Sequence, residues 1–350
     1  MKKRRSLISV VISVMLVLVL LAGCGGNGGQ QQTPPPTPPA NGENGETGEA
    51  DQHFTIGVIN LMEHMALDAA FRGFVSALAD NGFVDGDNIT IIYANALGDM
   101  PTLSTIADQH VNRNVDMILS ITTPATQMMA NATSTIPILG TAVTSYVVAG
   151  IIDSNERPGG NVSGTSDMNP VSAQVDLVID LVPDAQTIGL IYNSGEANSV
   201  LQVELAKERI EALGLEWVEV TVVTPADVIT AMQSLVGRVD AIYVPACNTM
   251  ASAMPAVHSV ALDAGIPVVA GERNMVMAGA LATMGIDYYE LGYATGLMAI
   301  DVLVHGANPA EMPIQFAPDV YDITINGLVA EEIGFTVPDR FLPYVVFPED

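Results

Sequence analysis

The feature of this sequence that most constrains its fold is a strand–loop–helix pattern that occurs twice along the chain. In each copy a short run of apolar residues predicts a buried strand, and a longer amphipathic stretch after a loop predicts a helix. Each predicted helix ends at a glycine, Gly82 or Gly214, as helices commonly do. The first copy comprises residues 55–59 and 67–81, and the second comprises residues 187–192 and 199–213.

The two halves stay alike through further predicted elements. Residues 88–93, 101–113 and 115–119 predict a strand, a helix and a strand in the first half, and residues 216–222, 225–236 and 239–243 do so in the second. A fourth strand follows Pro137 and Pro267. Strands that alternate with helices at this spacing indicate parallel βαβ units with right-handed crossovers. The predicted fold class is therefore α/β, with two doubly wound parallel-sheet lobes.

Ligands of such sheets bind beyond the carboxyl ends of the strands, where loops lead into helix N-termini. The loops after the first and third strands of each half therefore hold the candidate binding residues, and we expect them to line a cleft from both sides. In the first half these candidates are Glu63, His64, Thr122, Thr123 and Ala125, and in the second half they are Asn193, Glu196, Ala197, Asn198, Asn248 and Thr249.

The N-terminus has the form of a lipoprotein signal. Four basic residues, Lys2 to Arg5, precede an apolar run that ends at Gly23-Cys24. Because this run is shorter than the roughly 20 residues that span a bilayer, a permanent transmembrane anchor is the weaker alternative. We expect residues 1–23 to be removed and Cys24 to carry diacylglyceryl and palmitate groups that anchor the protein to the outside of the cell membrane. Residues 24–53, rich in Gly, Gln and Pro, predict a disordered linker.

Composition restricts the function classes. The chain has 39 Asp and Glu against 12 Lys and Arg, so its formal net charge is −27, which repels nucleic acid. The part that follows residue 53 is long enough for two cores. With Cys24 lipidated, Cys247 is the only other cysteine, so an intrachain disulfide is excluded. We expect a monomer with no nucleic-acid partner.

Signals for catalysis are missing from the sequence. The five histidines form no HExxH or Cys/His metal-ligand spacing, and neither a GxSxG nor a GxxxxGK[ST] motif occurs. His64 stands beside Glu63 but has no neighbouring nucleophile, and Cys247 is interpreted as a buried, inert thiol. We therefore predict a protein that is not an enzyme and that needs no cofactor and no metal.

Several segments carry a resemblance to a known family. They are residues 63–68, 122–125, 158–164, 193–199 and 279–289. From Phe54 to about Arg340 the chain resembles the ABC-transporter substrate-binding proteins that include tryptophan- and phenylalanine-binding lipoproteins. The resemblance implies a type I periplasmic-binding-protein fold, with crossings near residues 164–167, 283–287 and 316–319 that form a three-segment hinge. The implied lobes are residues 54–165 plus 284–316 and residues 166–283 plus 317–345.

The function that this resemblance implies is extracytoplasmic capture of a small amino acid for an ABC importer. The ligand would be an aromatic or other uncharged L-amino acid held in the interlobe cleft, and the partners would be a permease and an ATPase. A receptor domain that senses a related solute without transport is the alternative. Neighbouring genes for a permease and an ATPase would separate the two.

The amino-acid hypothesis assigns roles to particular residues. Asp287 is our first choice to hold the ligand ammonium, ahead of Glu63 and Glu196. Thr123 as N-cap and Pro124 as first helical residue would expose backbone N–H groups to the ligand carboxylate, although Thr123 serving only as a cap is the simpler alternative. The other expected contacts are Asp167 and Met168 at the first crossing and Glu272, whose neighbour Arg273 leaves the identity of the ligand open.

Overall fold

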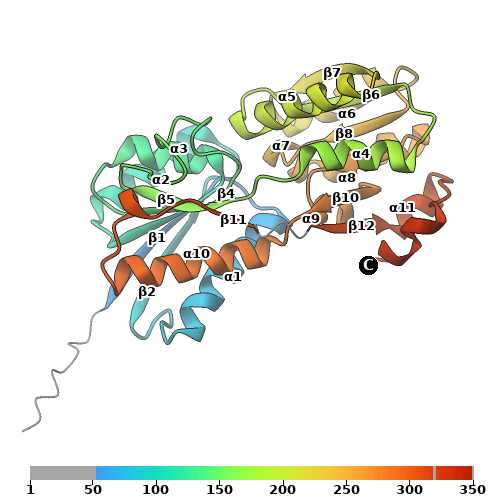
Figure 1. Cartoon of the computed structure of the whole chain (residues 1–350). Helices are drawn as coiled ribbons and strands as arrows, with labels where there is room; N and C mark the ends of the chain where they lie inside the picture. Colours follow the sequence, from blue (N-terminus) through green and yellow to red (C-terminus); the bar gives the residue numbers. More distant parts are fainter. Residues whose placement is uncertain (1–52, 318–320, 349–350) are drawn as a thin grey trace, which may run out of the picture. The chain divides into compact units, whose positions relative to one another are not determined.

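The computed structural model describes residues 53–317 and 321–348 of the chain, which form two α/β lobes (Figure 1). The predicted signal peptide, the lipidated Cys24 and the linker as far as Gln52 lie outside the described residues. No helix in the described part combines the length and the apolar character that crossing a membrane requires.

The first lobe is built on a six-stranded sheet of order β11-β5-β4-β3-β1-β2, in which all paired strands are parallel. Its strands are β1 (Phe54–Asn60), β2 (Ile89–Asn95), β3 (Met117–Ile121), β4 (Ile138–Val143), β5 (Val162–Ser166) and β11 (Gln315–Phe316). Its helices are α1 (Met65–Asp80), α2 (Met100–Asn112), α3 (Thr123–Ala132), α10 (Tyr288–Leu303) and the 3-10 helix η2 (Pro309–Glu311).

Both faces of this sheet are covered. Ile56 and Val58 of β1 pack with α1 and α10, whereas Ile59, on the opposite face of the same strand, packs with α2 and α3. Side chains of a strand alternate between faces, so a strand covered on both sides is apolar throughout. This is why the continuous apolar runs of the sequence correctly predicted buried strands.

The second lobe contains a seven-stranded sheet of order β13-β12-β10-β9-β8-β6-β7, parallel except for the pair β10–β12. Its strands are β6 (Thr187–Asn193), β7 (Glu216–Val222), β8 (Ala241–Val244), β9 (Val268–Ala270), β10 (Ala282–Gly285), β12 (Asp322–Asn326) and β13 (Val345–Val346). Helices α4 (Val171–Leu181), α5 (Ala197–Ala212) and α11 (Gly327–Glu332) and the 3-10 helix η3 (Asp339–Tyr344) cover one face. The other face carries α6 (Val228–Leu235), α7 (Asn248–Ser252), α8 (Met254–Ala264) and α9 (Arg273–Met277), and the 3-10 helix η1 (Pro225–Asp227) precedes α6.

The repeat predicted from the sequence is confirmed by the sheet orders. Strands β2-β1-β3-β4-β5 of the first sheet correspond to β7-β6-β8-β9-β10 of the second. Gly82 and Gly214, which follow α1 and α5, both have positive φ angles, 86° and 73°, which glycine adopts without strain. The predicted α/β class with two doubly wound lobes is correct.

The chain passes between the lobes three times (Figure 1). The first passage joins β5 to α4, the second joins β10 to α10, and the third joins β11 to β12 and includes residues 318–320, which are not described. Met284 and Gly285 belong to β10 of the second sheet, so this strand extends past the predicted lobe boundary at residue 284.

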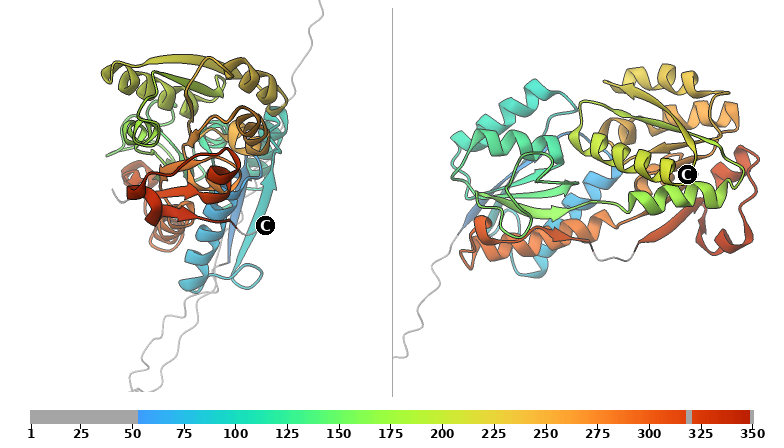
Figure 2. Two further views of the ribbon diagram at one scale, coloured as in Figure 1. Left: turned by 90° about the vertical axis from the view of Figure 1, so that its right-hand side faces the viewer. Right: turned by 45° about the horizontal axis from the view of Figure 1, so that its top comes forward.

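Helices α1 and α10 lie against each other closely enough for their backbones to touch (Figure 2). A Cβ atom added at Gly292 of α10 would lie 1.8 Å from the carbonyl oxygen of Ala70, and one added at Gly73 of α1 would lie 2.0 Å from that of Tyr289. Only glycine permits such an approach. Because α10 begins directly after the second passage, this contact fixes the position of Tyr288 over the first sheet.

Replacing Gly292 should therefore destabilise the first lobe. We expect Gly292→Ala to lower the free energy of unfolding by about 3 kcal/mol, because the overlap is with backbone and relief requires the helices to separate. The higher helix propensity of alanine offsets only a small part of this. Urea denaturation measures the change. Gly160→Ala is the control, since no atom lies within 4 Å of its added Cβ; equal midpoints for the two variants would contradict the close contact.

Candidate functional site

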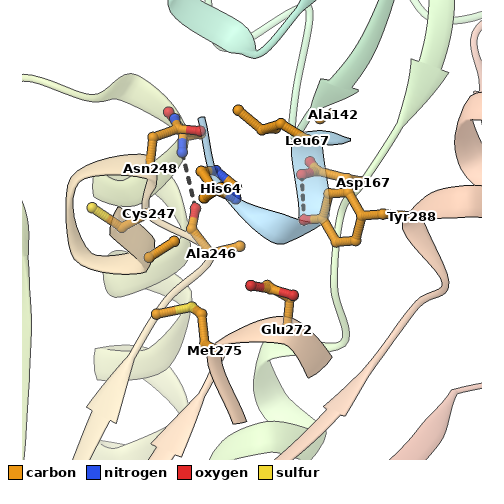
Figure 3. A pocket seen from close by; sticks show the side chains of 12 residues that line it. His64, Leu67, Ala142, Asp167, Ala246, Cys247, Asn248, Glu272, Met275 and Tyr288 are labelled. Atoms are coloured by element: carbon orange, nitrogen blue, oxygen red, sulfur yellow. Dashed lines mark hydrogen bonds between the residues drawn. The ribbon is translucent and has the colours of Figure 1, made fainter. Parts of the chain in front are cut away.

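A small cavity lies between the carboxyl ends of the two sheets (Figure 3). The first lobe and the passage after β5 contribute His64, Leu67, Ala142, Asp167 and Tyr288, and the second lobe contributes Asn198, Ala246, Cys247, Asn248, Ala251, Glu272 and Met275. We call this space the inner cavity. Its volume of about 20 Å³ is room for a single water molecule. Five of the predicted site residues, His64, Asp167, Asn198, Asn248 and Glu272, meet there.

Asp167 is the first residue after β5 and is 5% exposed. The Thr144 hydroxyl donates to its Oδ1 at 2.9 Å, and the Tyr288 hydroxyl donates to its Oδ2 at 2.8 Å. Burial raises the pKa of Asp167, while these two hydrogen bonds oppose the rise. Each carboxylate oxygen can accept more than one hydrogen bond, so Asp167 keeps acceptor capacity toward the cavity.

Glu272 reaches the same cavity from the second lobe. It is 3% exposed and caps the N-terminus of α9 by accepting a hydrogen bond from the backbone N–H of Asn274. Burial raises the pKa of Glu272 to about 7, the charge of Asp167 adds to the rise, and the N–H groups of Asn274 and Met275 oppose it. Among the described residues no Lys or Arg lines the inner cavity, and Arg273 is exposed. Two buried carboxylates therefore share this space without a cation.

The opposite side of the inner cavity carries neutral polar groups (Figure 3). His64 precedes α1 without capping it, and both its ring nitrogens are buried with no hydrogen-bond partner among the described residues. Burial lowers the pKa of His64 to about 4, against opposing effects of Asn248 and Glu196, so the ring is neutral at physiological pH. Asn198 donates to the carbonyl oxygen of Ala246 at 3.0 Å, but its Oδ1 is likewise buried and unpartnered within the described chain.

Glu196 has a structural role in the second lobe. Its carboxylate accepts hydrogen bonds from the backbone N–H groups of Asn248 and Thr249, both at 2.9 Å. It also accepts from the Asn248 amide at 2.8 Å and from the Thr249 hydroxyl at 2.7 Å. Asn193 supports the same loop by donating to the Thr249 hydroxyl at 2.8 Å. Glu196 thus fixes the β8–α7 loop to the start of α5, and its oxygens are already occupied.

A wider groove of about 660 Å³ lies at the mouth of the cleft. Glu63, Asn193, Glu196 and Thr249 line it from the two lobes. A third space has a volume of about 220 Å³. Glu63 lines both this space and the groove. His64, Ala251, Glu272 and Met275 line both this space and the inner cavity. The predicted loops therefore do face one another across a cleft.

The remaining first-lobe candidates are largely internal. The N-cap of α3 is Thr122, not Thr123 as predicted: the Thr122 side chain accepts a hydrogen bond from the Ala125 N–H, and the helix begins at Thr123. Threonine caps well at either position, so residue type did not distinguish them. Thr123 is buried and accepts from the Thr144 N–H, and Ala125 belongs to the core. In the second lobe, Ala197 is the half-buried first residue of α5, and Met168 is half-buried beside Asp167.

Asp287 lies apart from the candidate residues that line the inner cavity. It is exposed and caps α10, where its Oδ1 accepts from the N–H groups of Tyr289 at 2.7 Å and Glu290 at 3.4 Å. It lines a separate pocket of about 410 Å³, together with Glu290 and Phe316. Asp287, the residue predicted to hold the ammonium, is thus outside the inner cavity, whereas Asp167 lines it.

Sequence reasoning missed several residues of the inner cavity: Leu67, Ala142, Ala246, Cys247, Ala251, Met275 and Tyr288. Tyr288 lies in the segment of residues 279–289, which also contains Asp287. Cys247 was interpreted as an inert thiol. Burial raises the pKa of Cys247 far above its ordinary value, which agrees with an unreactive thiol. Ala142 has a positive φ of 55°, a conformation that its residue type does not indicate. In the described part of the chain no cluster of His, Cys, Asp or Glu is suited to hold a metal ion.

Comparison with known families identifies the class of protein. Residues 55–346 match the family described as ABC transporter substrate binding protein. This chain belongs to that family. The match covers both lobes and all the cleft loops, as the sequence segments indicated.

Three relatives are close enough to compare in detail. A tyrosine-binding protein of Clostridioides difficile is 45% identical over 271 residues, which is 77% of this chain and 78% of that protein. The ABC domain from Streptococcus pneumoniae in complex with L-Trp has a TM-score of 0.81 at 36% identity and covers 84% of this chain and 100% of its own. The ligand-free, open structure of a substrate-binding protein with adhesive properties from Clostridium difficile has a TM-score of 0.65 at 42% identity and covers 85% of this chain and 100% of its own.

The two buried carboxylates predict that, without a ligand, removing one charge favours the arrangement described here over one in which the cleft is open. Because the pKa of Glu272 is raised from 4.5 to about 7 in this arrangement, its ionisation opposes closure of the cleft above pH 4.5, and the cost grows until about pH 7. Glu272→Gln keeps an oxygen for the α9 cap and should favour the closed cleft by about 2 kcal/mol at pH 8.

Small-angle scattering of the ligand-free protein at pH 5 and pH 8 tests this expectation. Glu272→Gln should be more compact than the wild type, and the difference should be larger at pH 8 than at pH 5. Glu63→Gln is the matched control, because Glu63 is an exposed acid of the same cleft and its replacement should change little at either pH. A variant with the same compactness as the wild type at both pH values would show that Glu272 carries no such cost.

Proposed function

We propose that this protein captures an aromatic L-amino acid between its lobes, outside the cytoplasm, and delivers it to the permease and ATPase of an ABC importer. Membership of the substrate-binding family supports transport over sensing alone. The relatives support the ligand class, since one is named as a tyrosine-binding protein and another was solved with L-Trp. The protein then acts by binding and release, without catalysis.

The observation that carries this proposal is the pair of buried carboxylates without a cation. An ammonium group placed between Asp167 and Glu272 would pair with both and would offset the cost of their burial. It has three N–H donors, and both side chains retain oxygen lone pairs to accept them. Asp167, rather than Asp287, is therefore assigned the role of ammonium ligand.

The N-terminus of α1 is our proposed site for the ligand carboxylate. No side chain caps this helix, so its first N–H groups are free for an anion, and the helix dipole favours one there. His64 and Leu67 of this turn line the inner cavity, and the neutral His64 ring adds a donor. The N-terminus of α3 is less suitable, because Pro124 has no N–H and the Thr122 side chain already binds that of Ala125.

Binding requires the lobes to move apart and close again. An amino acid does not fit into about 20 Å³, so the inner cavity must open before the ligand enters. The lobes described here match the L-Trp complex with a TM-score of 0.81 and the ligand-free, open relative with only 0.65, although the open relative is the more similar in sequence. We infer that the lobes here are closed further than in the open relative, and that ligand stabilises a similarly closed arrangement in which the inner cavity is enlarged.

Removing the proposed ammonium ligand should weaken binding selectively. We expect Asp167→Asn to reduce the affinity for aromatic amino acids at least about 30-fold, because a desolvated ammonium loses a charged partner at a cost of about 2 kcal/mol or more. Calorimetry across the twenty amino acids, on the wild type and the variant, measures this effect.

Asp287→Asn is the matched control for that experiment, since asparagine also caps helices well and the residue lies outside the inner cavity. It should keep wild-type affinity. Loss of binding in Asp287→Asn with retention in Asp167→Asn would restore the assignment made from the sequence. If the wild type bound none of the twenty amino acids, the ligand class would be wrong.

We also propose that Cys24 is lipidated and tethers the protein to the membrane. The support is the Leu21 to Cys24 motif after a basic and apolar signal. Mass spectrometry of membrane-extracted protein should find the lipid on an N-terminal Cys24, and Cys24→Ser should be released or left unprocessed. Cys247→Ser, the control, should remain lipidated. Wild-type protein that is unmodified and entirely soluble would refute the anchor.

A further inference from the structure

Asn198 lines the inner cavity, and its amide oxygen is a buried acceptor without a partner in the described chain. We propose that Asn198 determines specificity by accepting the polar hydrogen of the ligand's aromatic ring, the phenol O–H or the indole N–H. Ligands that carry such a hydrogen are thereby selected over those with a hydrocarbon ring. This inference rests on the proposed function, which supplies the ligand class.

The orientation of the Asn198 amide is fixed by its surroundings. Asn198 is the second residue of α5 and is 6% exposed. Its Nδ2 donates to the carbonyl oxygen of Ala246 at 3.0 Å, an acceptor that the amide would lose if its two ends were exchanged. The Oδ1 is consequently held in a buried position where nothing in the described chain donates to it.

Asn198 is not needed to hold the loop that it contacts. Gln202 also donates to the Ala246 carbonyl oxygen, at 3.2 Å, and its own side-chain oxygen accepts from the Ala246 N–H at 3.1 Å. The loop therefore keeps its hydrogen bonds when the Asn198 side chain is removed. An unpartnered buried acceptor is unfavourable, so a role toward a ligand accounts for Asn198 better than a role in folding.

The Glu196 carboxylate, two residues before Asn198 in the chain, is already engaged, because it accepts from the backbone N–H groups and the side chains of Asn248 and Thr249. Asn198 lines the second-lobe wall of the inner cavity, and its amide oxygen has no partner among the described residues. His64, on the first lobe, is already assigned to the carboxylate.

The surroundings of Asn198 suit an aromatic ring. Ala246, Cys247, Ala251 and Met275 make the second-lobe wall largely apolar, and sulfur atoms pack favourably against aromatic rings. Figure 3 shows Cys247 and Met275 on the side of the cavity opposite the Asp167–Tyr288 pair. With the ammonium at the acidic side, the ligand ring points toward this wall, where its polar hydrogen meets Asn198.

A hydrocarbon ring would leave the Asn198 oxygen buried and unpaired in the complex. Sites built to hydrogen-bond a ligand hydroxyl discriminate strongly against an analogue that lacks it, for this reason. The expected preference is therefore for tyrosine or tryptophan over phenylalanine.

Calorimetric titration of the full chain with L-Tyr, L-Trp and L-Phe tests the inference. The wild type should bind the tighter of L-Tyr and L-Trp at least about tenfold more strongly than L-Phe. Asn198→Ala should reduce this ratio to about one, mainly through weaker binding of the ligand that carries the donor. Thermal unfolding without ligand verifies that the variant is folded, and Asn198→Asp, which keeps an acceptor oxygen, should retain the preference.

Asn169→Ala is the matched control. Its Oδ1 is also buried and unpartnered among the described residues, but its Nδ2 donates to the Asp167 carbonyl oxygen, and it does not line the inner cavity. It should leave the ratio unchanged. Equal wild-type affinities for the three ligands, or a ratio unaffected by Asn198→Ala, would overturn the inference while the proposed function stands. If the wild type bound none of the three, the proposed function would fail as well.

Discussion

Two carboxylates buried in one cavity without a cation are the constraint on which the behaviour of this cleft depends. Burial raises the pKa of both Asp167 and Glu272, and each is held by neighbours that its own part of the chain supplies. Closing the lobes without ligand brings two like charges out of water, which is unfavourable unless one takes up a proton. In the proposed mode of binding a ligand ammonium removes that obstacle, so closure and ligand binding would be coupled through charge.

The fold could be predicted from the sequence because its signals are local. Apolar runs, helix stops and their repetition predicted the first strands and helices of each half, with boundaries shifted by up to three residues, and the two-lobed fold class. The roles of the acids could not be predicted, because they depend on partners far away along the chain. Glu63, Glu196 and Asp287 all precede a helix, yet Glu63 is exposed, Glu196 is saturated by a loop some 50 residues later, and Asp287 caps α10.

The sequence also did not indicate which helix N-terminus keeps its N–H groups free for an anion. Sequence reasoning looks for residues that cap well, which selected the Thr-Thr-Pro start of α3. A good cap, however, occupies the N–H groups that a ligand would need. Helix α1 begins at Met65, directly after His64, and no side chain of the described residues caps it, so those groups stay free. The missing cap is the stronger sign of an anion site when the neighbouring side chains line a cavity.

The two halves share one architecture but use it differently. In the second lobe Glu196 fixes its own loops, so side chains such as Asn198 are presented from a rigid wall. The corresponding loop of the first lobe carries the exposed Glu63. The position of that loop depends instead on the contact between α1 and α10. Because α10 begins directly after a passage between the lobes, the N-terminus of α1 and Tyr288 are placed by the same contact. In the proposed mode of binding, the first lobe therefore offers backbone N–H groups at a position set by the hinge, and the second lobe offers the Asn198 side chain to the ligand.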